Sequence, residues 1–207
     1  HICDHHQLMH SGRDAELIHI GDYIDRGAQS REVIDRLMSG LGDFQTTCLL
    51  GNHEAMLLEC IATDNRQAWN TWLSNGGVET LASIGMSLHF GGYNPEELHA
   101  SLGEERVAWL KSLPLSRTIA PYLFVHAGIA PGVPIDDQQP KDILWIRSRF
   151  LDSDEDHGHL VVHGHTPGDE PVVRANRICI DTGATSNGLL TAVVLDGAAA
   201  PMFLRAV

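Results

Sequence analysis

The chain has 207 residues, of which 43% are hydrophobic, and a formal net charge of −13 at pH 7. A chain of this length can form one domain with a substantial core, and we expect a single globular domain over 1–207. Nucleic acids and anionic membranes are polyanions, so the negative charge argues against both as partners. It does not exclude a phosphate substrate, because metal ions and a few arginines can reverse the potential locally.

The cysteines are scattered, and no two of them form a C-x-x-C pair: Cys3, Cys48, Cys60 and Cys179. This pattern predicts reduced core thiols in a cytosolic protein. No apolar stretch approaches the roughly 20 residues that cross a bilayer, and no signal peptide is recognisable. We therefore expect a cytoplasmic location.

The first half of the chain predicts a βαβ unit followed by a helical insertion. Strands are expected at 17–20 and 46–50, and between them a helix over 30–38 that Ser30 caps. An insertion at about 55–117 is expected to consist of short helices over 55–61, 67–73, 78–84, 96–102 and 105–113. We expect its tryptophans to serve mainly as core: Trp69, Trp72 and Trp109.

The second half returns to strands, expected at 121–126, 160–163, 177–181, 190–195 and 202–205, with a loop at 131–140. The acidic run at 152–156 is expected to be a solvated loop, because it lacks the glycine and the distal glutamate of a calcium-binding loop. Strands early and late with helices between them predict the α/β class.

Four apolar runs end in a metal-ligand residue beside glycine, at 21–27, 51–54, 126–128 and 163–166. They supply carboxylate, amide and imidazole groups, and we expect these strand ends to converge on one metal centre. Mixed oxygen and nitrogen ligands without thiolate favour Mn, Fe or Zn. A carboxylate can bridge two cations about 3.5–4 Å apart, which clamp a displacement at phosphorus while a bridging water attacks.

The remaining polar groups suit the same chemistry. Arg26 and Arg147 can hold phosphate oxygens as bidentate donors. His53 follows a candidate ligand directly and can protonate a leaving alkoxide, while Asp25 can orient it.

The motifs Gly-Asp-x-x-Asp-Arg-Gly, Gly-Asn-His-Glu, His-Ala-Gly and Gly-His-Thr, in this order, resemble the calcineurin-like metallophosphoesterases. Within that family, they and the segments 75–85, 143–147 and 180–184 are most similar to the bacterial serine/threonine phosphoprotein phosphatases. The resemblance runs from about Leu17 to Leu195. It implies an α/β fold with a β-sandwich flanked by helices and a helical insertion.

The resemblance also implies roles for individual residues. Asp22 would bridge two metal ions, and Asn52, His126 and His165 would bind the second of them. His53 would be the general acid, paired with Asp25. Arg26 and Arg147 would bind the phosphate group. Glu54 is expected to support the loop, and His163 to lie behind the ligands.

The family has a further upstream motif whose Asp-x-His pair holds the first metal. Asp4 and His6 have the right mutual spacing, but only 18 positions separate Asp4 from Asp22. A strand, a crossover of a dozen or so residues and a second strand need more than that. We expect that neither residue is a ligand, and that the sequence is a fragment that lacks the true pair and an upstream strand.

We therefore expect a phosphomonoesterase that hydrolyses phosphoserine or phosphothreonine in phosphoprotein or phosphopeptide substrates, with phosphotyrosine as a further candidate. Two divalent metal ions are expected, manganese first, with iron and zinc as alternatives. Two other hypotheses remain open: a symmetrical dinucleoside tetraphosphate hydrolase, and a catalytically silent relative that binds phosphorylated partners.

Overall fold

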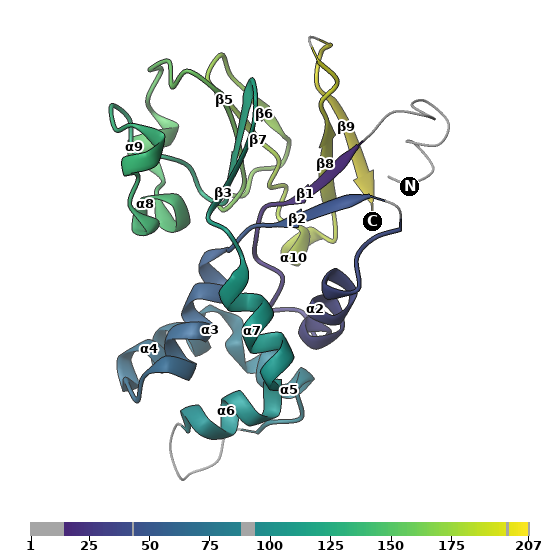
Figure 1. Ribbon diagram of the computed structural model, residues 1–207, viewed down its shortest axis with the longest axis vertical. Coiled ribbons are helices and arrows are strands. Elements are labelled where there is room, and N and C mark those ends of the chain that lie inside the picture. Colours follow the sequence, from purple (N-terminus) through teal and green to yellow (C-terminus); the bar gives the residue numbers. More distant parts are fainter. Residues whose placement is uncertain (1–14, 43, 88–93, 198, 207) are drawn as a thin grey trace. The chain divides into compact units, whose positions relative to one another are not determined.

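The computed structural model describes residues 15–42, 44–87, 94–197 and 199–206 (Figure 1). Asp4 and His6, with the rest of the N-terminal segment, lie outside the described residues. The chain divides into two compact units. We call His19–Leu41 with Cys48–Leu115 the helical unit, and the described part of 1–18 with Gly42–Thr47 and Ser116–Val207 the β unit.

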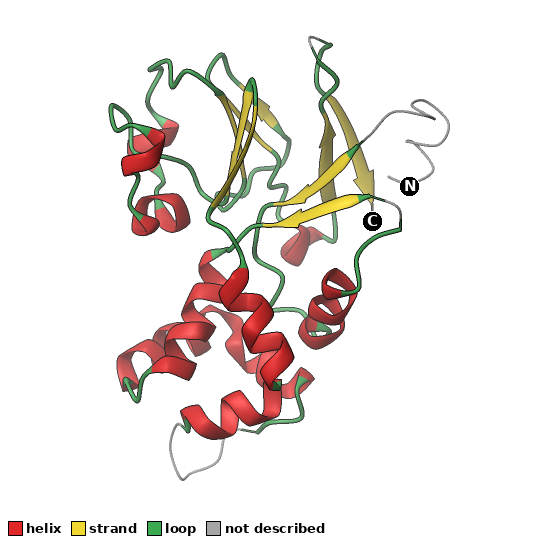
Figure 2. Ribbon diagram, viewed as in Figure 1, coloured by secondary structure: helices red, strands yellow, loops and turns green. Residues whose placement is uncertain are grey.

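The helical unit contains most of the helices that Figure 2 shows in red. Their bounds are α2 (Ser30–Met38), α3 (Asn52–Ala62), α4 (Arg66–Trp72), the π-helical turn η1 (Leu73–Gly77), α5 (Val78–Ser83), α6 (Pro95–Leu102) and α7 (Glu104–Ser112). Helix α3 packs against α4, α6 and α7, and α2 packs against α5 and α7. Trp69 and Trp72 are fully buried in this core and Trp109 packs against it, as the sequence predicts.

Local sequence explains where α6 begins. Asn94 precedes α6, and its side-chain oxygen accepts a hydrogen bond of 3.0 Å from the Glu97 N–H. Pro95 fills the first helical position, and two glutamates occupy the first turn, where they complement the helix dipole.

The β unit holds a five-stranded mixed sheet in the order β3-β4-β5-β7-β6. The strands are β3 (Ser116–Ile119), β4 (Tyr122–Val125), β5 (Leu160–His163), β6 (Val172–Val173) and β7 (Arg177–Cys179). The central pairs β4–β5 and β5–β7 are parallel, and both outer pairs are antiparallel. Val161 and Val162 of β5 are buried, as expected for a central parallel strand.

The other strands form two-stranded sheets. Strands β1 (Glu16–His19) and β2 (Gln45–Cys48) pair with each other, and β8 (Leu190–Val194) pairs antiparallel with β9 (Met202–Ala206). The β unit also contains a 3-10 turn, η2 (Ile135–Asp137), and short helices α8 (Pro140–Trp145), α9 (Ser148–Leu151) and α10 (Ala184–Asn187). In the part of the chain that the structure describes, no helix is long and apolar enough to cross a membrane.

The structure corrects several sequence-based expectations. Ser30 does not cap α2: the N-cap position is Gln29, and the Ser30 hydroxyl instead accepts a hydrogen bond of 3.1 Å from the Asp25 N–H. Asn52 and His53 do not sit on a strand end but open helix α3, because Gly51 turns the chain directly into that helix. The sequence pattern missed β3, β6 and α10, which are only two to four residues long and show no clear periodicity.

Candidate active site

The turn that follows β1 carries unusual backbone geometry. Asp22, Asp25 and Arg26 have φ angles of 61°, 74° and 62°. His165 in the β unit has a φ of 64°, and in the described ranges no other residue besides glycine has a positive φ. Such conformations cost about 1–3 kcal/mol each and persist where the surrounding structure enforces them, commonly at functional sites. All four residues are ones that the sequence singled out as candidate site residues.

The Asp22 segment is held by the start of α3. The buried Glu54 carboxylate accepts hydrogen bonds from the backbone N–H groups of Asp22 (2.9 Å), Tyr23 (2.6 Å) and Gly51 (2.9 Å). Burial, and then the charge of Asp22, raise the pKa of Glu54 to about 7. A Cβ at position 51 would lie 2.5 Å from Asp22 Oδ1 and 2.6 Å from Glu54 Oε2, so only glycine allows this approach.

Asp25 and His53 form a buried pair in the helical unit. His53 Nδ1 lies 2.6 Å from Asp25 Oδ2, and because a carboxylate only accepts, Nδ1 carries the hydrogen and leaves Nε2 for substrate chemistry. Burial acts to lower the pKa of His53, but the hydrogen bond to Asp25 and the charges of Asp22 and Asp25 outweigh it and raise the pKa above its usual value. The pair therefore holds a proton at neutral pH better than an isolated histidine would.

Two residues that the sequence did not assign to the site contact Asp25. Trp72 Nε1 donates to both carboxylate oxygens, at 3.0 and 3.1 Å, and Thr80 Oγ1 donates to Oδ1 at 2.6 Å. One feature of the sequence could have identified Thr80 as a site residue: it lies in the segment 75–85, which resembles the bacterial phosphatases. Nothing in the sequence separates the Trp72 indole from an ordinary core tryptophan.

Arg26 is fixed by η1. Its backbone N–H donates to the Gly76 carbonyl at 3.0 Å, and its Nε donates to the Asn75 carbonyl at 3.2 Å. Gly76 has a φ of 108°, and a Cβ there would lie 2.5 Å from Arg26 Cγ. The Arg26 side chain is exposed, so its terminal nitrogens can reach an anion.

In the β unit, two histidines meet after neighbouring parallel strands. His126 follows β4, His165 follows β5 by two residues, and the Gly164 N–H donates to the His126 carbonyl at 2.8 Å. Both side chains are buried, and His126 Nε2 lies 3.2 Å from His165 Nδ1. The carboxyl ends of parallel strands meet at one sheet edge, which brings residues 39 positions apart together.

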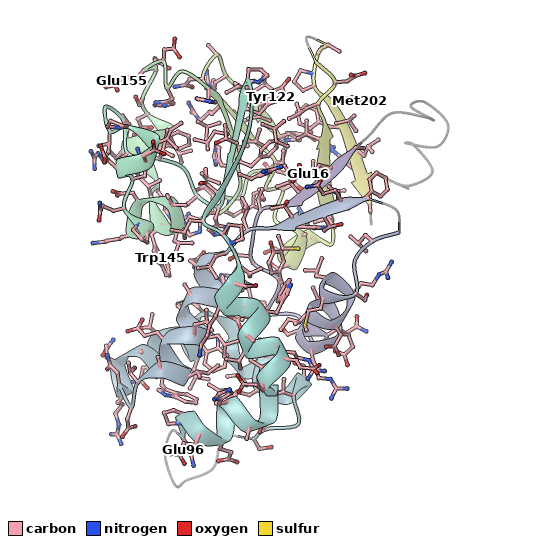
Figure 3. All side chains as sticks on the ribbon, in the orientation of Figure 1. Glu16, Glu96, Tyr122, Trp145, Glu155 and Met202 are labelled. Atoms are coloured by element: carbon pink, nitrogen blue, oxygen red, sulfur yellow. The ribbon has the colours of Figure 1, made fainter. Side chains whose placement is uncertain are left out.

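Arg147 and Trp145 flank His165. Arg147 is exposed between α8 and α9, and its Nη1 donates to the Thr166 hydroxyl at 3.3 Å. Trp145, labelled in Figure 3, ends α8, and its ring stands nearly perpendicular to that of His165 at 5.8 Å between centroids. This contact uses one guanidinium nitrogen of Arg147, and its other N–H donors can bind a phosphate group.

His163 lies behind these residues. It is fully buried at the end of β5, its Nδ1 lies 3.1 Å from the Gly164 carbonyl, and its ring stacks edge-on to Phe150 at 5.1 Å. Burial lowers its pKa to about 4, so the imidazole is neutral at physiological pH.

The donor atoms in both units suit a divalent cation. Two nitrogens that bind one cation at about 2.0–2.1 Å lie roughly 3.0–3.4 Å apart, and the two imidazole nitrogens of the β unit are 3.2 Å apart. In the helical unit, Asp22 Oδ1 lies 3.4 Å from the His53 N–H nitrogen at the start of α3, beside Asn52. Carboxylate, amide oxygen and imidazole without thiolate match Mn, Fe or catalytic Zn.

Comparison with known proteins agrees with this chemistry. The sequence profile described as "Calcineurin-like phosphoesterase" matches residues 6–188. The chain belongs to the calcineurin-like phosphoesterase family. Members of this family are metal-dependent phosphoesterases, so divalent metal ions and hydrolase activity are implied for the chain.

Relatives of two kinds match the chain. Serine/threonine-protein phosphatase 2 of Salmonella typhimurium is 30% identical over 198 residues, which cover 89% of this chain and 82% of that protein. The symmetrical bis(5'-nucleosyl)-tetraphosphatase of Aromatoleum aromaticum is 31% identical over 113 residues, which cover 55% of this chain and 33% of that protein.

The fold comparison agrees. A metallophosphoesterase from Sphaerobacter thermophilus superimposes with a TM-score of 0.51 at 17% identity, covering 97% of this chain and 81% of that structure. The α/β calcineurin-like fold expected from the sequence is thereby confirmed, as is the family that the motifs resemble.

Proposed function

We propose that the protein is a metal-dependent phosphomonoesterase that acts on phosphoserine or phosphothreonine in proteins or peptides, with phosphotyrosine as a possible further substrate. The observation that carries the proposal is the buried Asp25–His53 pair at 2.6 Å, with the pKa of His53 raised. Such a pair supplies a proton to a poor leaving group, and the alkoxide of serine or threonine is one.

The chain's own residues carry the following steps. Arg26 and Arg147 bind phosphate oxygens and orient the ester. Water adds its oxygen to phosphorus while the ester P–O bond breaks, and the leaving oxygen takes the proton from His53 Nε2. The attacking water gives up one proton, and His53 takes up a proton again before the next turnover. The products are the alcohol and inorganic phosphate.

We propose Asp22, Asn52, His126 and His165 as metal ligands for two divalent ions, manganese first and iron or zinc as alternatives. When bound, the ions supply Lewis-acid polarisation of the phosphoryl group and activate the attacking water. The motif order and the family membership support this assignment.

A second candidate keeps the chemistry but changes the substrate. The match to a symmetrical bis(5'-nucleosyl)-tetraphosphatase favours a dinucleoside tetraphosphate. The phosphatase relative favours the first proposal, because the match covers 82% of that protein against 33% of the tetraphosphatase. Steady-state kcat/KM on a phosphothreonine peptide and on diadenosine tetraphosphate separates the two, and preference for the second substrate would overturn the first proposal.

The role of His53 can be tested directly. We expect His53→Asn in the manganese-loaded protein to lower kcat on a phosphopeptide by about 10²–10⁴-fold, the usual contribution of general acid catalysis. His99→Asn is the matched control, because His99 pairs with Glu104 on the surface. A wild-type rate for His53→Asn would show that the general-acid assignment is wrong.

A catalytically silent phosphate-binding protein is the remaining alternative. It predicts binding of a phosphopeptide without turnover, and fewer than two manganese ions per chain by elemental analysis of the full-length protein. Two bound ions together with turnover would exclude it.

A further inference from the structure

The Asp25 carboxylate has four hydrogen-bonding contacts from three side chains. Oδ1 accepts from Thr80 Oγ1 (2.6 Å) and Trp72 Nε1 (3.0 Å), while Oδ2 accepts from His53 Nδ1 (2.6 Å) and Trp72 Nε1 (3.1 Å). An ionised carboxylate offers about four lone-pair sites, so the contacts leave it no freedom to rotate away from His53.

The backbone of Asp25 is held by the same residue. The Asp25 N–H is shared between Thr80 Oγ1 at 2.9 Å and Ser30 Oγ at 3.1 Å, so the Thr80 hydroxyl accepts from the backbone and donates to the side chain of one residue. Asp25 has a φ of 74°, which an aspartate does not favour, and the clamp from both sides offsets that strain.

Both clamping residues come from one short stretch. Trp72 ends α4, Thr80 lies in the first turn of α5, and η1 between them packs Gly77 so closely on the Trp72 ring that a Cβ would lie 2.6 Å from it. The side chains of Trp72, Thr80 and Asp25 are all buried. The stretch is therefore built around the carboxylate and not only around apolar packing.

We propose that Trp72 and Thr80 are positioning residues for catalysis, which fix the Asp25 carboxylate so that it holds His53 with Nε2 directed at the leaving group. This inference rests on the proposed function, in which His53 is the general acid. Both side chains are fully buried and bonded to Asp25, so we infer that each acts through Asp25 and not on the substrate.

The test uses the dependence of rate on the leaving group. Thr80→Val removes the hydroxyl at constant volume, and Trp72→Phe removes the indole N–H. We expect each to lower kcat of the manganese-loaded protein about tenfold on phenyl phosphate, whose leaving oxygen needs a proton, and less than about twofold on p-nitrophenyl phosphate, whose leaving group does not.

Two matched controls separate positioning from folding. Thr80→Ser keeps the hydroxyl and should restore the rate on phenyl phosphate. Trp109→Phe makes the same chemical change at a partly buried indole that packs on Tyr23, and should leave the leaving-group dependence unchanged. An equal loss on both esters, or no loss on either, would overturn the inference.

A second readout does not need turnover. The His53 Nδ1–H, bonded to a carboxylate at 2.6 Å, should give a low-field proton resonance in the metal-free protein. Thr80→Val and Trp72→Phe should shift it upfield or abolish it, whereas Thr80→Ser and Trp109→Phe should not. If wild-type protein with metal hydrolyses neither ester, the proposed function fails, and an unchanged resonance in both variants still overturns the positioning role.

Discussion

His53 and His163 are both buried histidines, but their surroundings move their protonation in opposite directions. His53 faces the carboxylate of Asp25, and its pKa is raised. His163 is buried against Phe150, with Arg177 near enough to disfavour a further positive charge, and its pKa is lowered to about 4. Burial dominates the pKa of His163, whereas at His53 the hydrogen bond to Asp25 and the charges of Asp22 and Asp25 outweigh it.

His163 makes the stability of the metal-free protein depend on pH. Between pH 6.5 and 4 the unfolded chain binds a proton at this position that the folded chain rejects, so stability falls as the pH drops through that window. The full effect is on the order of 3 kcal/mol. We expect urea denaturation curves from pH 7 to 4 to show this loss, and a smaller loss in His163→Asn. Identical pH dependences in the two proteins would contradict the prediction.

At the scale of elements, the stretch from α4 through η1 to α5 fixes the positions of two candidate site residues, Asp25 and Arg26. Trp72 and Thr80 bind Asp25, while Asn75 and Gly76 bind Arg26 through their carbonyls. In an ordinary α-helical turn, the carbonyls of Asn75 and Gly76 would not point toward Arg26. Gly76 allows the backbone to leave the helical conformation here, with a φ of 108°.

Gly76→Ala tests this element. The substitution places a Cβ 2.5 Å from Arg26 Cγ, whereas Gly85→Ala has a similar positive φ of 76° and no heavy atom within 4 Å. Both should lose about 1 kcal/mol from backbone strain, and Gly76→Ala should lose roughly 1–3 kcal/mol more from overpacking. Thermal unfolding measures the difference, and the displaced Arg26 should raise KM for a phosphopeptide in Gly76→Ala alone. Equal losses in both variants would show that the contact with Arg26 is unimportant.

At the scale of the whole molecule, the proposed ligands are contributed by both units: Asp22 and Asn52 by the helical unit, His126 and His165 by the β unit. A single domain over 1–207 stays a prediction. Metal binding tests the ligand assignment, because an ion that binds only the folded protein stabilises it.

We expect manganese at 100 times its dissociation constant to stabilise the metal-stripped protein by about 2.7 kcal/mol for each ion bound. Thermal unfolding with and without manganese measures this gain. His126→Asn should reduce it, and His99→Asn should retain it. A full gain in His126→Asn would show that His126 is not a ligand.

The sequence by itself determined the family and most of the longer strands and helices, and it singled out the eight candidate site residues, because these depend on local runs and short motifs. The tertiary structure decided what surrounds Asp25: Trp72 and Thr80 lie 47 and 55 positions away from it. It also decided that Ser30 binds the Asp25 backbone instead of capping α2, and that the nitrogens of His126 and His165 lie 3.2 Å apart. Hydrogen bonds between residues so far apart leave no periodic pattern in the sequence, since each requires only one donor and one acceptor and any number of residues can separate them.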